Sequence, residues 1–357
     1  MAAPRACKET TLGFVERTEN WRLSRQFFPS KVGGKPAWLS MTDIPTSEKL
    51  NCRKCGAVCV FLMQVYCPIT EQGTCFHRTL FIFCCRDPTC HKHSDNAAFV
   101  VFRSQLPREN EFYDYEPPDE DVPLGEGKDC NSSGGDVTDD SLCAVCGCFG
   151  GKKCAKCHMK SYCCREHQLI DWKAGHRKEC GSTGSIANGC KQILFPEFEL
   201  VTESEDYHHE DMDDGGKEES HVQDDTGDKS EINVAELEKM ALSESKEDRQ
   251  FAKFKKRTDH EPDQVIRYQL GGQPLLISCE NQPQQQDIPP CSSCGSERHF
   301  EFQVMPQLLI HLDVDSLEAS IDWGTLLIYT CAKSCDGASA YLPEFLWKQD
   351  IVPESNK

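Results

Sequence analysis

Apolar residues along the chain occur in short runs separated by polar turns, which is the pattern of β-strands. Three runs in the first third lie at Cys59–Val65, Thr79–Phe83 and Ala97–Phe102. They are rich in aromatic and β-branched residues, which favour strands. From Pro262 onward the chain again reads as strands and turns. We therefore expect a mixed, mainly β fold, with one β-module at residues 1–115 and a second at 258–357.

Segments of different composition separate the two modules. Residues 116–141 are mostly Pro, Gly, Asp and Ser, which predicts a flexible linker. Residues 201–231 hold about thirteen Asp or Glu against two Lys, so they cannot bury enough apolar surface to fold. We expect a disordered acidic segment here, within a linker over 181–231. Helical spacing of apolar residues over 232–257 predicts a helix that docks on a partner or packs on its own protein.

The second module repeats the order of the first. A Cys-x2-Cys-Gly motif opens each one, and a glutamine, Gln64 or Gln303, follows twelve residues after its first cysteine. A second apolar run then ends on another cysteine pair, and an aromatic-basic dipeptide follows in both modules. Such an ordered repeat predicts duplicated modules, each closed by a four-cysteine metal site. The proposed ligands are Cys52, Cys55, Cys85 and Cys90 in the first half, and Cys291, Cys294, Cys331 and Cys335 in the second.

Two alternatives stay open for these outer sites. The cysteines could be buried thiols without a metal. In the first half, another ligand could also replace one of the four, because several suitable side chains lie near them in the sequence: Cys59, Cys67, Cys75, His77 and His91.

Charge and cysteine content narrow the classes of function. The 39 Lys and Arg against 58 Asp and Glu give a net charge of −19, which disfavours sequence-independent binding to phosphate backbones and favours a basic partner. The N-terminal residues contain no apolar signal region, and no run approaches the about 20 apolar residues of a membrane span. We therefore expect a soluble, cytoplasmic and nuclear protein without a membrane partner. In a reducing compartment, 24 cysteines at short fixed spacings indicate zinc rather than disulfides.

The densest cysteine and histidine block lies at residues 143–180. Its eight potential ligands form four pairs, enough for two tetrahedral Zn²⁺ ions. Cys-x2-Cys turns supply two pairs, and residues four apart, on one face of a helical turn, supply the others. Spacing alone allows a sequential or an interleaved pairing. Because protein side chains fill every position, both ions would be structural. The ligands are Cys143, Cys146, Cys154, Cys157, Cys163, His167, His176 and Cys180.

This block resembles the MYND zinc finger. The resemblance rests on Tyr162-Cys163, His167-Gln168, Asp171-Trp172 and His176-x3-Cys180. It implies an interleaved pairing, in which Cys143, Cys146, Cys163 and His167 hold the first ion and Cys154, Cys157, His176 and Cys180 hold the second. MYND fingers serve as docking surfaces, which implies Pro-rich peptides or corepressor proteins as partners. The finger carries about eight basic residues against three acidic ones, so DNA contact stays open although the overall charge disfavours it.

Segments outside the finger resemble the programmed cell death protein 2 family of animals. These include Trp38-Leu39 after Gly33-Gly34, Phe195-Pro-Glu-Phe-Glu199 and Asp322-Trp-Gly324. The resemblance spans almost the full length apart from the polar linkers. It implies a dedicated chaperone of one small-subunit ribosomal protein, of the uS-five class, during 40S ribosome assembly. The alternative is a nuclear regulator of transcription, proliferation and apoptosis that recruits corepressors or touches DNA through the finger.

Catalytic motifs are absent from the sequence. The Gly33-Gly34 and Gly271-Gly272 pairs lack the following residues of a phosphate-binding loop, and neither Gly-x-Ser-x-Gly nor His-Glu-x-x-His occurs. The Asn-His cofactor motif that accompanies the finger in methyltransferases does not occur either. We therefore expect a protein without enzymatic activity and with zinc as its cofactor, two ions in the finger and two more in the outer sites.

Overall fold

The structure is a computed structural model that describes residues 9–118, 141–181, 193–205, 246–314 and 320–351. The β-strands within these ranges are β1 (Thr11–Glu16), β2 (Lys31–Val32), β3 (Val60–Tyr66), β4 (His77–Cys84), β5 (Phe99–Leu106), β6 (Lys152–Lys153), β7 (Ser161–Tyr162), β8 (Phe198–Ser204), β9 (Ile266–Tyr268), β10 (Arg298–Val304), β11 (Thr325–Cys331) and β12 (Leu342–Gln349).

Helices are few, and most are single turns. The α-helices are α1 (Arg165–Asp171), α2 (Arg177–Glu179) and α4 (Lys246–Thr258), with the π-helix η7 (Trp172–His176) between the first two. The 3-10 turns are η1 (Asn20–Leu23), η2 (Arg25–Phe27), η3 (Ser47–Leu50), η4 (Gly73–Cys75), η5 (Pro88–Cys90), η9 (Gln285–Asp287) and η10 (Pro306–His311). The mainly β fold is therefore confirmed.

Ten of the strands close into one barrel, in the order β1-β8-β2-β3-β4-β5-β12-β11-β10-β9. Each half contributes four consecutive neighbours, β2 to β5 from the first and β9 to β12 from the second. The halves meet at one seam where β5 pairs with β12, while β1 and β8 fill the other seam between β2 and β9. The two expected modules thus share a single sheet. Closure leaves none of these ten strands with a free edge.

The apolar runs found in the sequence correspond to β3, β4 and β5, which confirms those strands. All eight residues of β4 are buried. Packing on both faces explains why the run Thr79–Phe83 is continuous rather than alternating. Trp38 covers the outer face, with its ring centroid 5.1 Å from that of Phe81 and 5.8 Å from that of Phe83.

The prediction that disorder begins at Val201 is wrong. Strand β8 runs through this position and pairs with both β1 and β2. Leu200 is buried. The apolar stretch around it is short and is followed by many acidic residues, so the composition of the segment did not predict a strand. The strand is also required by topology, because it fills the seam between β1 and β2. The remainder of the acidic segment, residues 206–231, and the linker at 119–140 lie outside the described residues.

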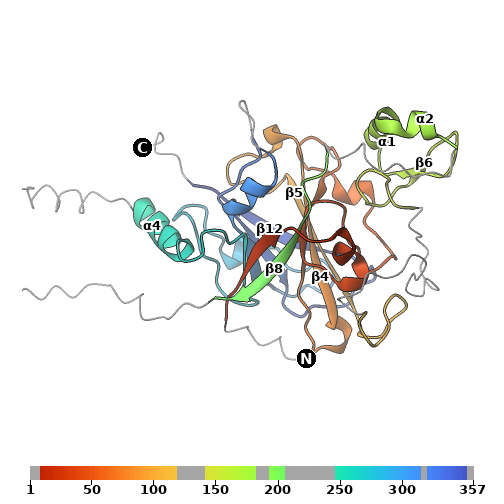
Figure 1. Ribbon diagram of the computed structural model, residues 1–357. Helices are drawn as coiled ribbons and strands as arrows, with labels where there is room; N and C mark the ends of the chain where they lie inside the picture. Colours follow the sequence, from red (N-terminus) through yellow and green to blue (C-terminus); the bar gives the residue numbers. More distant parts are fainter. Residues whose placement is uncertain (1–8, 119–140, 182–192, 206–245, 315–319, 352–357) are drawn as a thin grey trace, which may run out of the picture.

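The predicted helix is present over part of its length. Helix α4 covers Lys246–Thr258, and residues 232–245 lie outside the described part of the chain. Phe254 is buried in a small cluster with Ile277 and Met305. The helix therefore packs on its own protein, on the side of the barrel opposite the finger (Figure 1).

The repeat extends to the irregularities of the sheet. Strands β3 and β10 each contain a bulge at the same position, with Leu62 as the extra residue in one and Glu301 in the other. Two residues after each bulge, Gln64 and Gln303 bind the backbone N–H and C=O of a loop residue, Ala37 in the first half and Leu275 in the second. Each glutamine thus fixes a loop against the barrel.

A buried ion pair joins the two halves. Arg78 from β4 and Glu301 from β10 are fully buried and form a two-pronged contact, in which Arg78 Nη2 lies 2.7 Å from Glu301 Oε2. Three strands separate β4 from β10 in the barrel order, so the contact spans the interior. Tyr268 and Thr330 also donate to Glu301. Burial disfavours the carboxylate, but Arg78 outweighs it and holds the pKa of Glu301 below its ordinary value.

Replacing Glu301 with alanine is expected to destabilise the protein by about 3–5 kcal/mol, because Arg78 would keep a buried charge without a partner. Urea unfolding measures the change. The exposed Glu297→Ala provides a control for the loss of one charge. The double variant Arg78→Met with Glu301→Leu is expected to regain much of the stability. A Glu301→Ala variant as stable as the Glu297→Ala control would contradict the stabilising role of this ion pair.

Candidate metal centres

Four clusters of ligand side chains occur in the described part of the chain. In each cluster the ligand atoms lie within 4.8 Å of one another. The memberships coincide with the four sets expected from the sequence, including the interleaved pairing in the finger. They are Cys52, Cys55, Cys85 and Cys90; Cys143, Cys146, Cys163 and His167; Cys154, Cys157, His176 and Cys180; and Cys291, Cys294, Cys331 and Cys335.

The same backbone turn opens every cluster. In each Cys-x2-Cys motif, the residue after the second cysteine donates its N–H to the carbonyl of the first cysteine, at 2.8 to 2.9 Å. That residue has a positive φ in all four turns, and it is glycine in three of them. Glycine adopts this conformation without strain. The turn brings the two thiols of the motif to one side. The four residues are Gly56, Gly147, His158 and Gly295.

Sulfur spacing in the clusters fits tetrahedral zinc. A Zn–S bond of about 2.3 Å implies neighbouring sulfurs about 3.8 Å apart. The Sγ atoms of Cys55 and Cys85 are 3.7 Å apart, those of Cys154 and Cys180 are 3.9 Å apart, and those of Cys294 and Cys331 are 3.6 Å apart. A disulfide would require about 2.05 Å. The donor sets therefore fit Zn²⁺.

The two histidines in the finger face their clusters through different ring nitrogens. Nδ1 of His167 lies 3.0 Å from the sulfur of Cys163. In the second cluster, Nε2 of His176 lies 3.4 Å from the sulfur of Cys154 and 3.5 Å from that of Cys157. Both histidines come from the helical part of the finger, α1 and η7. Each could supply one neutral nitrogen to a metal ion.

The turns also favour the thiolate form of several ligands. A hydrogen bond from the Ala57 backbone lowers the pKa of Cys55, and one from the Met159 backbone lowers that of Cys157. In the last cluster, hydrogen bonds from the Ser296 side chain and backbone lower the pKa of Cys294 to about 6. Because metal ions bind the thiolate rather than the thiol, these bonds prepare the turns for a metal.

A network of buried charges lies beside the last cluster. The side chain of Glu344 is fully buried and accepts hydrogen bonds from Arg103, Arg298 and the backbone N–H of Cys331. Arg103 also donates to the carbonyl of Cys335, at 3.1 Å. Arg103 belongs to the first half, so this network joins that half to the cluster of the second. Sequence reasoning did not identify Glu344.

The side chains considered as replacement ligands have other neighbours. Cys59 donates to the carbonyl of Ala98, and Cys67 lies against Arg78. His91 Nε2 lies 2.8 Å from the carbonyl oxygen of Cys85 rather than at its sulfur. The remaining unassigned cysteines are also outside the clusters: Cys75, Cys84 and Cys148 are buried, Cys164 caps α1, and Cys279 is exposed. Cys7, Cys130 and Cys190 lie outside the described residues.

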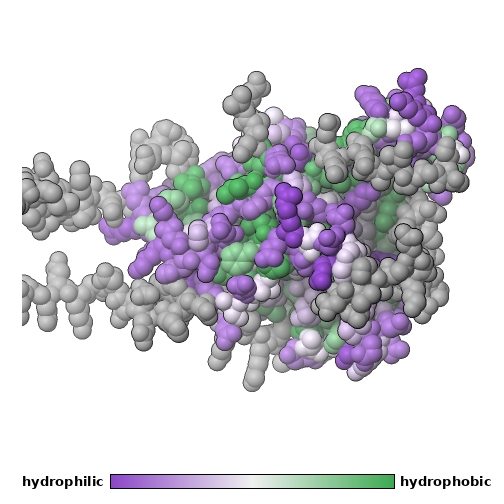
Figure 2. All heavy atoms as spheres, viewed as in Figure 1, coloured by the Kyte–Doolittle hydropathy of each residue, from purple (hydrophilic) through white to green (hydrophobic). Residues whose placement is uncertain are grey.

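The finger packs tightly against the barrel. The indole Nε1 of Trp38 donates to the carbonyl of Gly147 at 2.7 Å, and Lys35 Nζ donates to that of Ala144 at 2.8 Å. Val145 is completely buried at this contact. The finger's other surface projects from the barrel at the upper right of Figures 1 and 2 and is largely hydrophilic. Sequence reasoning did not identify this contact, because the Gly-Gly-x-Pro segment before Trp38 recurs at Gly271 and therefore marks the repeat rather than the finger.

These features define a zinc-finger protein built on a closed β-barrel, and residues 143–180 match the family model "MYND finger". The chain belongs to the programmed cell death protein 2 family. Residues 9–120 match the model of that family's N-terminal domain, and residues 248–350 match the model of its C-terminal putative domain.

Sequence similarity to members of this family extends over nearly the whole chain. Programmed cell death protein 2 of Bos taurus is 48% identical over 96% of each chain, and that of Mus musculus is 47% identical over the same shares. A shorter match, 33% identical over 28% of this chain and 27% of the relative, is the "Probable 20S rRNA accumulation protein 4" of Schizosaccharomyces pombe. No solved structure matches the chain. Among the described residues, no helix has the length and apolar character needed to cross a membrane.

Replacing Trp38 with phenylalanine is expected to loosen the finger from the barrel, because the buried carbonyl of Gly147 would lose its donor at a cost of about 1–3 kcal/mol. Limited proteolysis within residues 141–181 should become faster. Trp347→Phe is the matched control, because its indole donates to Asn281 at 2.9 Å, away from the finger. Equal cleavage rates in the two variants would show that Trp38 does not hold the finger.

Proposed function

We propose that this protein is a dedicated chaperone of a basic small-subunit ribosomal protein, of the uS-five class, in 40S ribosome biogenesis. The observation that carries the proposal is the similarity to a yeast protein named for 20S rRNA accumulation, together with membership of the programmed cell death protein 2 family. A free ribosomal protein is strongly basic, and a chaperone must neutralise that charge until rRNA does so.

The charge distribution supports this proposal. The chain has a net charge of −19. On the barrel, Glu16 of β1 stands directly opposite Glu199 of β8, and Glu203 is exposed further along β8. Like charges placed opposite each other on neighbouring strands destabilise a sheet, and a bound cationic segment would relieve the repulsion. The acidic sequence of residues 206–231 follows this strand directly. We infer that β1 and β8 form part of the surface that binds the client.

We further propose that the protein binds four Zn²⁺ ions and that their role is structural. Each cluster offers four protein ligands, so a tetrahedral ion would keep no position for water or substrate. This ligand count supports a structural rather than a catalytic role for the ions, and we propose a binding function without catalysis. The ions would stabilise the fold, since zinc affinity at such sites is largely folding free energy.

A second candidate function is that of a regulator in the nucleus that recruits corepressor proteins through the finger. Two exposed apolar side chains favour it: Met159 is 53% exposed and Leu169 is 46% exposed. Both belong to the finger, and a small apolar surface on a rigid scaffold suits peptide docking. The two functions require different surfaces, and we propose that the protein acts in both cytoplasm and nucleus.

Elemental analysis of the purified protein is expected to find four zinc ions per chain. Cys291→Ser combined with Cys294→Ser should lower this to three and reduce thermal stability, because the last cluster would lose its opening turn. Cys279→Ser is the matched control, since this exposed cysteine lies outside every cluster. Two zinc ions per native chain would restrict the metal to the finger and overturn the proposed outer sites.

Co-expression with the ribosomal protein tests the chaperone function directly. The native chain should keep the client soluble, and the Cys291→Ser, Cys294→Ser variant should not, because unfolding of one half opens the shared barrel. The variant Cys154→Ser with Cys157→Ser disrupts the second cluster of the finger. The two hydrogen bonds that join the finger to the barrel involve Ala144 and Gly147, which do not belong to that cluster. This variant should still hold the client. If it loses the client while the first variant retains it, binding resides in the finger instead.

A further inference from the structure

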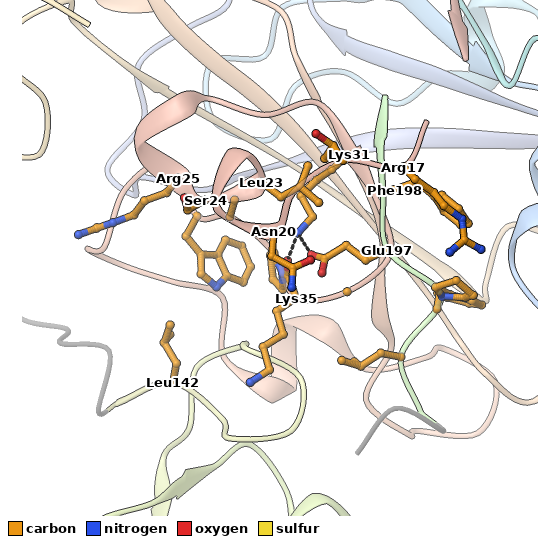
Figure 3. A pocket seen from close by; sticks show the side chains of 18 of the residues that line it. Arg17, Asn20, Leu23, Ser24, Arg25, Lys31, Lys35, Leu142, Glu197 and Phe198 are labelled. Carbon is orange, nitrogen blue, oxygen red and sulfur yellow. Dashed lines mark hydrogen bonds and ion pairs between the residues drawn. The ribbon is translucent and has the colours of Figure 1, made fainter. Parts of the chain in front are cut away.

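A large pocket lies where the finger meets the barrel. Its volume is about 1280 Å³. Residues 17–41, which include β2, form one wall, and the segment 194–198 leading into β8 forms another. Leu142 closes the side toward the finger (Figure 3). The pocket exceeds the range of about 300–1,000 Å³ that is usual for small-molecule sites, which indicates a longer ligand.

The pocket is positively charged in a strongly acidic protein. Five cationic side chains line it against two carboxylates, Glu197 and Asp313. Lys31 is buried and pairs with Glu197, as the dashed line in Figure 3 shows, so these two charges cancel. Four cations then face one carboxylate. The five cations are Arg17, Arg25, Lys31, Lys35 and Arg86.

Two of these arginines hold donors that the protein leaves unused. Nη1 of Arg25 and Nη1 of Arg86 are shielded from solvent, and neither has a hydrogen-bond acceptor among the described residues. The guanidinium of Arg86 is held in place over the ring of Phe195, 4.4 Å from its centroid. Buried donors without acceptors are costly, and a carboxylate would satisfy them with strong, charge-assisted bonds.

The placement of the charges favours a peptide over a compact anion. Figure 3 shows Arg17 and Arg25 on opposite sides of the pocket, with Lys35 directed toward the finger. A single phosphate could not reach these sites together. Apolar side chains also line the pocket, including Leu23 and Phe198. A long polyanion such as RNA would experience the net charge of −19 beyond the pocket, whereas a short segment would not.

We infer that this pocket binds an acidic peptide segment of a partner protein, in which carboxylates alternate with apolar side chains. The ligand has the opposite charge to the ribosomal client proposed above, so the site serves a second partner. Lys35 and Trp38 line the pocket and also donate hydrogen bonds to the finger, so the finger fixes this part of the wall. This inference is independent of the chaperone proposal.

A fluorescein-labelled peptide of ten alternating glutamates and leucines is the probe, and anisotropy with the full-length, zinc-loaded protein measures binding. Arg17→Gln combined with Arg25→Gln is expected to weaken binding of the peptide about tenfold or more, because the variant loses one to two charge-assisted hydrogen bonds to the peptide carboxylates. Lys253→Gln with Lys256→Gln is the matched control, since both lysines are exposed on α4 and the change in net charge is equal. The control should change the affinity less than twofold.

Circular dichroism and zinc content establish that each variant is folded before binding is compared. Peptide in which glutamine replaces glutamate should bind at least about tenfold more weakly if carboxylates are recognised. Absence of binding to the native protein would overturn the inference, and so would equal weakening in the control. Displacement of the peptide by inorganic phosphate or by a short RNA at equal or lower concentration would also overturn it, in favour of a phosphate site. Client solubility in co-expression should not change in the Arg17→Gln, Arg25→Gln variant.

Discussion

Closure of the barrel is the constraint on which the rest of the structure depends. The chain contributes four neighbouring strands from each half, and neither set is a complete sheet. Backbone groups along β5 obtain their partners from β12, and those along β9 obtain theirs from β1. Because a free edge of this kind would leave polar backbone groups unpaired, each half completes the other. The ion pair across the interior and the Glu344 network at the seam add contacts of the same kind, between residues more than two hundred positions apart.

Local sequence patterns determined much of this fold. Apolar runs located β3, β4 and β5. The repeat grouped the outer cysteines into the sets that the structure brings together, whereas the interleaved sets in the finger came from its resemblance to MYND fingers, because spacing alone left two pairings open. The repeat indicated two similar halves. It did not show that they share one sheet, because strand pairing between distant segments leaves no periodic signal. Strand β8 was missed for the same reason: its few apolar residues matter only because β1 and β2 flank them. The structural roles of Glu301 and Glu344 could not be predicted, because the sequence does not distinguish a buried glutamate from an exposed one until its partner is known.

Opposite charges are separated on the molecule. Glu16 of β1 and Glu199 and Glu203 of β8 are acidic, as is much of the sequence after β8, whereas basic residues gather in the pocket next to the finger. A protein with a uniform negative field would bind cationic segments anywhere on its surface. Separation of the two signs allows two ligands of opposite charge to be held at once and at different places, and it sets the orientation in which a charged partner approaches. The finger contributes to this arrangement because Lys35 and Trp38, which line the basic pocket, also donate hydrogen bonds to finger residues.

The pairing of β5 with β12 has a consequence for biosynthesis. Strand β5 ends at Leu106, and its partner begins only at Leu342. At translation rates of about 5–20 residues per second, the ribosome needs about 10–50 s to make the intervening chain. Throughout this interval the nascent first half carries an open sheet edge and apolar faces that have no partner on the same molecule. A chain of this topology must therefore be shielded during its own synthesis, and its yield in a cell would depend on how promptly the last strand leaves the ribosomal tunnel.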